Sequence, residues 1–266
     1  MSTFSITPRI NAVVRTLLLS PDKRTVYAGG DFGLLALNSN TGKVRFRVNV
    51  AKDNGPGRIF DLAIVGSSLY IGGEFNTIGK HAYHNIARLS LTGTPDTSWK
   101  PGVASGFSAG RSAPVQALAV SPSGQTVYIG GNFRTINDTS VSVTTLNKPI
   151  SLLAVSALDG TVQPQRFSPD LTTFDVADKP LYVHDIVVTD SYVIVAWGGE
   201  NFLSFHSPDG ATLKQYSGAG DVQAVDPTLL RAFEDIIEHT HQFNHSMIRH
   251  FQRSMGNPLQ VRRALS

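Results

Sequence analysis

The chain has 266 residues, of which 41% are hydrophobic and 16% are charged, and it contains no cysteine. A sizeable core is therefore available, while disulfides, zinc–cysteine sites, iron–sulfur clusters and thiol catalysis are excluded. The formal net charge of +3 argues against a nucleic-acid binder. The 24 glycines and 14 prolines suit a β protein rich in turns.

The first residues, Met1 to Arg9, lack the basic start and long apolar run of a signal peptide. Nowhere does the sequence approach the roughly 20 apolar residues that a membrane-spanning helix needs. Taken literally, the sequence predicts a cytoplasmic protein. That expectation does not hold if the chain is a fragment of a longer precursor.

One pattern occurs four times: an apolar strand, a turn, and a second strand that ends in two glycines shortly before a phenylalanine. The four first strands begin at Val14, Ile59, Val115 and Val183, and the glycine pairs begin at Gly29, Gly72, Gly130 and Gly198. Third strands are expected at Gly33–Asn38, Asn85–Ser90, Ser151–Ser156 and Phe202–Ser207. Fourth strands are expected around the aromatic residues Phe46, Trp99, Phe167 and Tyr216.

Each unit is thus a four-stranded antiparallel meander with two apolar faces, which cannot bury both faces alone. Radial stacking of such units gives a β-propeller; a β-sandwich or barrel of similar strands is the alternative. The turns between third and fourth strands each contain a glycine that accepts positive φ. These turn glycines are Gly42, Gly93, Gly160 and Gly210. The tyrosines before the glycine pairs and the phenylalanines after them are expected to pack between blades.

The segment Val115–Phe133 reads Val-x-Ala-Leu-x-Val-Ser-Pro-x-Gly-x-x-Val-Tyr-Ile-Gly-Gly-x-Phe and resembles the delta-60 repeat. The resemblance covers about residues 4–225. It implies a bacterial β-propeller domain of unknown function, of a kind often found in secreted or cell-surface proteins. The repeat carries no known catalytic residues, so the resemblance assigns none here.

The repeat pattern is partial at both ends. Phe4–Asn11 resembles a last strand with its linker, and Gly220–Val225 resembles the opening of a fifth unit. Four units and a fragment do not make an obvious closed ring. An array left open exposes an apolar blade face through which two chains could associate.

A different composition begins at Asp226-Pro227, which is a strong helix start. No glycine or proline follows from Thr228 to Met255, and the apolar residues approximate a heptad seam. We therefore expect two domains, an incomplete propeller-like repeat domain over residues 1–225 and a helical tail over residues 226–266. The tail could cover the open array, form oligomers, or be a fusion or frameshift product on a truncated propeller.

Motifs that carry chemistry are weak in this chain. Gly106–Gly110 matches the nucleophile-elbow pattern but lacks the following helix, so a flexible loop is expected. His241 and His245 have the i, i+4 spacing of metal ligands, but a solvated helix face is the expected explanation, and no metal site is predicted. Acidic or amide residues recur beside the glycine pairs and are expected to cap turns by local hydrogen bonds rather than to bind calcium. These residues are Asp31, Glu74, Asn132 and Glu200.

The sequence favours a non-catalytic scaffold or binding module without cofactor or metal, which engages a protein or carbohydrate partner through its loops. The expected contact loops are Asn76–Asn85, Gly102–Pro114 and Thr135–Pro149. The alternatives are a hydrolase or lyase that uses the central channel, and a non-functional fragment of a longer repeat protein. For an enzyme, the candidate residues near the first strands are Asp61, His184 and Asp185.

Overall fold

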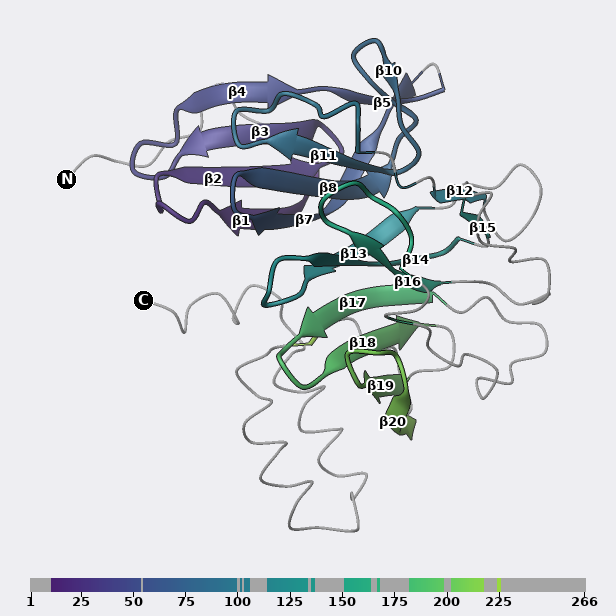
Figure 1. Cartoon of the computed structure of the whole chain (residues 1–266). Helices are drawn as coiled ribbons and strands as arrows, with labels where there is room; N and C mark the ends of the chain where they lie inside the picture. Colours follow the sequence, from purple (N-terminus) through teal and green to yellow (C-terminus); the bar gives the residue numbers. More distant parts are fainter. Residues whose placement is uncertain are drawn as a thin grey trace.

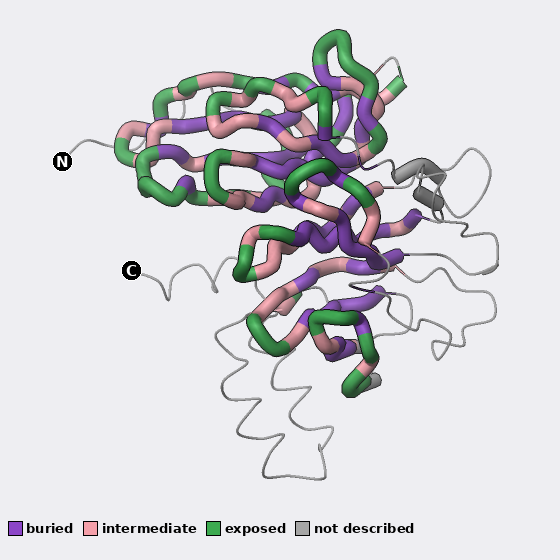
Figure 2. Tube along the Cα trace, viewed as in Figure 1, coloured by how far each residue is buried: buried purple, intermediate pink, exposed green. Residues whose placement is uncertain are grey.

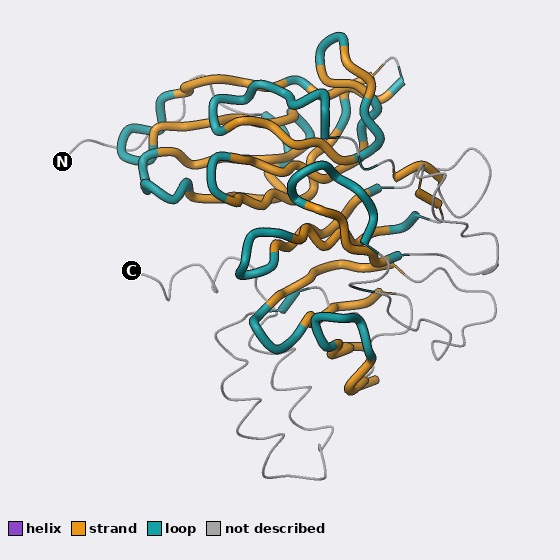
Figure 3. Tube along the Cα trace, in the orientation of Figure 1, coloured by secondary structure: helices purple, strands orange, loops and turns teal. Residues whose placement is uncertain are grey.

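The computed structural model describes residues 11–53, 55–99, 101, 103–105, 114–133, 135–136, 151–163, 167, 182–198, 202–217 and 224–225. Within these ranges the regular elements are all β-strands, as Figure 3 shows. The fold is therefore all-β, as expected. The predicted helix over 228–255, residues 4–10 of the predicted N-terminal strand and linker, the motif at 106–110 and the tail histidines lie outside the described residues.

Four antiparallel sheets follow one another along the chain and lie in that order in space (Figure 1). Sheet 1 has the order β1(Val14–Leu19), β2(Thr25–Gly30), β3(Gly33–Asn38), β4(Val44–Val48). Sheet 2 comprises β7(Arg58–Val65), β8(Ser68–Glu74) and β11(Ile86–Ser90). Sheet 3 comprises β13(Val115–Val120), β14(Thr126–Gly131) and β16(Leu152–Ser156). Sheet 4 has the order β17(Tyr182–Val188), β18(Val193–Gly198), β19(Phe202–His206), β20(Thr212–Ser217).

The hydrophobic core lies between the sheets. One buried cluster joins sheets 1 and 2 through residues such as Tyr27 and Ile71. A second joins sheets 2 and 3, and a third joins sheets 3 and 4. Figure 2 accordingly shows buried segments along the strands and exposed segments at the turns. Each sheet is thus stabilised mainly by its neighbours, which is the packing expected of a repeat array.

The turns between third and fourth strands behave as the sequence predicts. Their glycines all have positive φ, a conformation that a β-carbon disfavours. The values are 73° at Gly42, 87° at Gly93, 81° at Gly160 and 95° at Gly210. The third strands also match the predicted ranges to within one residue at either end. Local turn chemistry therefore fixes the length of each meander.

The expected fourth strands form in two of the four sheets. Phe46 lies in β4 and Tyr216 in β20. The prediction is wrong for the described residues of sheets 2 and 3, where an isolated β-bridge stands instead at Leu89–Pro95 and at Val155–Val162. Trp99 and Phe167 lie outside strands, yet both are buried between sheets. These two aromatic side chains serve packing and do not mark an edge strand.

The fourth glycine pair is misplaced in the sequence analysis. The ladder of sheet 4 pairs Asp185 with Ala196 and Val183 with Trp197, in the positions where sheet 2 pairs Asp61 with Gly72 and Ile59 with Gly73. Ala196 and Trp197 therefore replace the two glycines, and Gly198 comes one residue later. The indole of Trp197 donates to the hydroxyl of Ser204 at 2.7 Å, which accommodates this large side chain in the buried sheet.

Two small accessory ladders extend beyond the main sheets. The first has the order β10(His81–Ala82), β9(Thr77–Ile78), β5(Val50–Lys52), β6(Gly55–Pro56), and the second pairs β12(Val103–Ser105) with β15(Thr135–Ile136). Both lie on the right in Figure 1, the side where second strands end and new units begin, hereafter the accessory end. The opposite side, with the hairpin turns, is the turn end. The described part contains no helix long and apolar enough to cross a bilayer.

Candidate functional site

The first strand of every sheet contains the same irregularity. In β1, β7, β13 and β17 one residue is bulged out of the ladder. A bulge bends the strand and redirects the side chain that follows it. The residues directly after the four bulges are Thr16, Asp61, Ala117 and Asp185. Carboxylates thus occupy this position in the second and fourth sheets only.

Asp61 and Asp185 make nearly identical hydrogen bonds. Oδ1 of Asp61 accepts the amide of Leu62 at 2.8 Å, and Oδ2 accepts the amide of Leu118 in the next sheet at 2.7 Å. Oδ1 of Asp185 accepts the amide of Ile186 at 2.8 Å, and Oδ2 accepts the amide of Val225 at 2.8 Å. Each carboxylate therefore ties its own strand to the segment that follows it around the array.

The bond to Val225 bears on the partial fifth unit. Counted from the first strands, Val225 holds the place that Leu118 holds in sheet 3, and it packs against Ile194 and Phe205 as part of a small apolar cluster. Ala224–Val225 thus engages sheet 4 as the first strand of a sheet would.

Burial and, to a smaller extent, the nearby charge of Asp185 raise the pKa of Asp61 to about 7, against the opposing effect of the amide donors. Burial likewise raises the pKa of Asp185 to about 6. Buried carboxyl groups with a pKa near neutrality are suited to acid–base chemistry. Both oxygens of each carboxyl nonetheless already accept main-chain amides, as expected of a residue that links two segments of the fold.

The third enzymatic candidate, His184, is the bulged residue of β17. Its ring lies 4.8 Å from the ring of Tyr182 in an edge-on arrangement. Asp61 and Asp185 thus hold corresponding positions on their first strands, whereas His184 stands one residue earlier, at the position of Phe60 in sheet 2. The charge of Asp185 acts on Asp61. Among the described residues, no three His, Asp or Glu side chains gather to form a metal site.

Of the acidic residues beside the glycine pairs, Asp31 does not cap a turn as expected but forms an ion pair, and Glu74 also forms one. Asp31 accepts Arg15 Nε at 2.7 Å, and Glu74 pairs with Lys52. Arg58 lies between them, 3.9 Å from Asp31 and 3.7 Å from Glu74. These five side chains form a line of ion pairs at the accessory end, which we call the charged rim. The corresponding position in sheet 3 is Asn132, and Glu200 lies outside the described residues.

The accessory ladders repeat one design on two successive units. The linker into sheet 2 supplies β5, which pairs with β9 in the loop after β8, and the linker into sheet 3 supplies β12, which pairs with β15 in the loop after β14. The paired sequences correspond as well. Val50-Ala51 matches Val103-Ala104, and Thr77-Ile78 matches Thr135-Ile136. This shared Thr-Ile after each phenylalanine is the signal that the sequence analysis overlooked.

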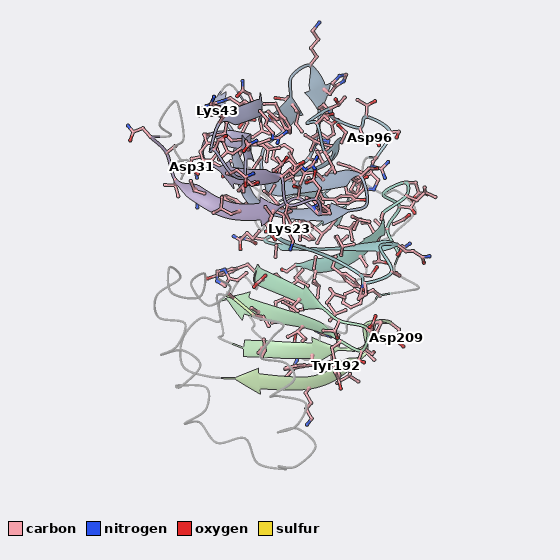
Figure 4. The ribbon with its side chains drawn as sticks, turned by 90° about the vertical axis from the view of Figure 1, so that its left-hand side faces the viewer. Lys23, Asp31, Lys43, Asp96, Tyr192 and Asp209 are labelled. Carbon is pink, nitrogen blue, oxygen red and sulfur yellow. The ribbon has the colours of Figure 1, made fainter. Side chains whose placement is uncertain are left out.

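The predicted contact loop Asn76–Asn85 is therefore an ordered hairpin rather than an irregular loop. Ile78 pairs with Val50 and is buried in the core between sheets 1 and 2. Lys80 and His81 at the tip are exposed. Figure 4 looks at the opposite turn end, where Lys43 and Asp209 mark the hairpin turns. The other two predicted loops lie mostly outside the described residues.

Comparison with solved structures places this architecture. The RRP9 WD40 repeats match with a TM-score of 0.52 at 12% identity, covering 81% of this chain and 54% of that one. The chain has a β-propeller fold. The WD40 domain of Neurospora crassa Pan2 matches at a TM-score of 0.48 and 13% identity, covering 79% of this chain and 51% of that one.

The computationally designed protein Ika8 matches at a TM-score of 0.47 and 16% identity, covering 83% of this chain and 52% of that one. The chain thus spans about half the length of each of these three solved chains. No family model and no curated protein matches the sequence.

Proposed function

We propose that this chain is a non-catalytic propeller scaffold or binding module that engages its partner through the accessory end. The observation that carries the proposal is the repeated pairing of linker and loop strands. It turns two connecting segments into ladders anchored on the core, and propeller function generally lies on such connecting segments. The resemblance of the repeats to the delta-60 group supports a secreted or cell-surface setting for this binding.

The charged rim favours a protein partner over a carbohydrate. Paired charges at a surface give orientation and specificity toward a complementary protein. Carbohydrate sites usually add an aromatic platform, since a ring offers an apolar face with a polar edge. The large hydrophobic residues that are exposed in the described ranges are aliphatic and include no aromatic residue. A carbohydrate ligand therefore remains the alternative partner class.

Two matched charge reversals test this proposal. Lys80→Glu alters the hairpin tip at the accessory end, and Lys43→Glu alters an exposed turn at the opposite end. The wild-type chain would be screened on peptide and glycan arrays, and the best ligand measured by calorimetry. We expect Lys80→Glu to weaken binding about tenfold, which is about 1.4 kcal/mol, and Lys43→Glu to leave it unchanged. Equal effects of both variants, or no ligand on either array, would contradict the proposal.

The raised pKa values of two buried carboxyls support a second candidate function, a hydrolase or lyase that uses Asp61 and Asp185. Groups that titrate near neutral pH are suited to general acid–base catalysis. A panel of chromogenic glycoside, ester and phosphate substrates would test it. Activity that Asp61→Asn abolishes, with a pH profile governed by a group near pH 7, would support the enzyme. A folded wild-type chain inactive on the whole panel, or turnover that persists in Asp61→Asn, would count against these residues.

A further inference from the structure

One strand face of sheet 1 is uncovered in the described structure. Val13, Val14, Leu17 and Leu19 are exposed, and they make up four of the six exposed large hydrophobic residues in the described ranges. Val14 is 46% exposed and Leu17 is 42% exposed. Val14, Leu17 and Leu19 share one side of β1 because the bulge at Arg15 shifts the alternation by one residue, so they form one strip, hereafter the β1 face. Val13 directly precedes the strand. Soluble proteins rarely leave such a contiguous apolar strip open without an interaction to cover it.

The other sheets show what covers this face. Ile59, Val115 and Val183 correspond to Val14, and each is completely buried. The β-carbon of a residue at Gly29, Gly72 or Gly130 would lie 2.4–2.6 Å from these side chains, so the preceding sheet supplies bare backbone at the contact. The cover of a first strand is therefore the second strand of the preceding sheet.

The buried carboxylates indicate which kind of sheet should precede β1. The amide of Leu118 bonds to Asp61 in the sheet before it, and the amide of Val225 bonds to Asp185 in the sheet before it. Leu17 corresponds to Leu118 and Val225. Thr16, Asp61, Ala117 and Asp185 alternate between non-acidic and acidic along the array. Since Thr16 in sheet 1 is non-acidic, the alternation continues if the sheet before β1 has an aspartate at this position, as sheet 4 has Asp185.

We propose that a second copy of this chain covers the β1 face, with its sheet 4 in the place of the preceding sheet. The amide of Leu17 then bonds to Asp185 of the second copy, as Leu118 bonds to Asp61. The same contact forms twice about a twofold axis, so two copies close into one ring.

Within a single chain, Ala224–Val225 occupies the surface of sheet 4 that β1 of the second copy would contact. Its amide already occupies Oδ2 of Asp185, and its side chain packs on sheet 4. Association of two copies must displace this short segment, so the dimer competes with an intramolecular contact. Ala196 stands at the glycine position of sheet 4, and Val14 therefore meets a methyl group there instead of bare backbone. Both features make the association reversible and dependent on concentration.

The first test is the mass in solution over a range of concentrations, measured by light scattering after size exclusion. We expect the wild-type chain to shift from 28.6 kDa toward twice that mass. Leu17→Asp should remain monomeric. Leu158→Asp changes another leucine, 81% exposed in a turn of sheet 3, and should behave as the wild type. A wild-type chain that stays monomeric at its highest attainable concentration overturns the proposal.

The second test uses a variant that should strengthen the dimer, so it does not depend on whether Leu17→Asp folds. Val225→Pro lacks an amide hydrogen, so it cannot donate to Asp185 and leaves that acceptor to the second copy. We expect its dimer dissociation constant to fall about tenfold relative to the wild type. Circular dichroism would establish that the sheets persist. An unchanged or weaker dimer in Val225→Pro shows that sheet 4 is not the surface that receives β1.

Discussion

Asp61 illustrates how one side chain can serve two sheets. Its position after a bulge aims the carboxylate at the gap between strands, where it accepts the amides of Leu62 and Leu118 and, at 3.4 Å, the hydroxyl of Thr16. Hydrogen bonds to a charged group contribute about 1.5–3 kcal/mol each, but an ionised carboxylate pays for its desolvation. Burial is the larger influence on its pKa, so folding favours the protonated form of Asp61 relative to the unfolded chain.

We expect this imbalance to appear as a pH-dependent stability. Because the folded chain raises the pKa of Asp61 from 3.8 to about 7, its contribution is fully present below about pH 4 and is lost as pH rises through about 7. The slope is at most about 1.4 kcal/mol per pH unit for one proton. Denaturant unfolding from about pH 5 to about pH 8 should show wild-type stability falling, and Asp61→Asn should flatten that fall.

The matched control for this titration is Asp22→Asn. Asp22 lies exposed at the turn end, and its hydrogen bonds from Ser20 and Arg24 lower its pKa. Its effect on stability is therefore confined to acid below the chosen window. The same direction of change is expected from Asp185, whose pKa is raised to about 6. A wild-type profile that rises between pH 5 and 8 would show that the carboxylates are stabilised by their amides more than burial opposes them.

At the scale of the strand and sheet, the regular part of each unit could be predicted from sequence. Alternating apolar residues, turn glycines and the Tyr-x-Gly-Gly pattern are local signals, and they located the third strands closely. The tyrosines do reach between sheets, since Tyr27 donates to the carbonyl of Leu91 at 2.8 Å and Tyr70 to that of Ala157 at 3.2 Å. The accessory ladders and the register of sheet 4 were not predicted, because both depend on which strands lie side by side.

The misplaced fourth unit shows why literal matching fails. Gly198-Gly199 matches the pattern in letters, but register is set by which residue opposes which across the ladder, and a shift of two residues keeps the same faces. The pairing of Asp61 with a distant amide could not be inferred, because it requires the next sheet to be in place. The alternation of a non-acidic and an acidic residue at this position of the first strands, from Thr16 through Asp61 and Ala117 to Asp185, is nevertheless visible in the sequence.

The close approach of a glycine in one sheet to a first strand in the next leads to a prediction about stability. A β-carbon at Gly72 would lie 2.6 Å from Cγ1 of Val115, so Gly72→Ala forces sheets 2 and 3 apart. Overpacking of this kind costs about 1–3 kcal/mol, measurable as a lower midpoint of denaturant unfolding. Gly55→Ala is the control, because its β-carbon would meet only the carbonyl of Lys52 at 3.7 Å. Similar losses in both variants would mean that glycine is needed for flexibility rather than for close approach.

At the scale of the whole molecule, stability is shared only between neighbours. Sheets 2 and 3 are covered on both faces by described clusters, whereas β1 presents an open face. Local opening free energies in such an array follow the number of covering neighbours. The chain therefore has a stable centre and a weak first strand, and the same open strand is the surface inferred to receive a second copy.

Hydrogen exchange can test both the lower stability of β1 and its recovery when two copies associate. In dilute solution, amides of β8 and β14 should exchange slowest and those of β1 among the fastest of the main strands. Raising the protein concentration should slow β1 toward the rate of β13, its counterpart in sheet 3, since association buries the same positions. Leu17→Asp should keep β1 fast at every concentration while leaving β8 unchanged. If β1 were already as protected as β13 in dilute solution, its exposed face would be closed within one chain, and no second copy would be needed to cover it.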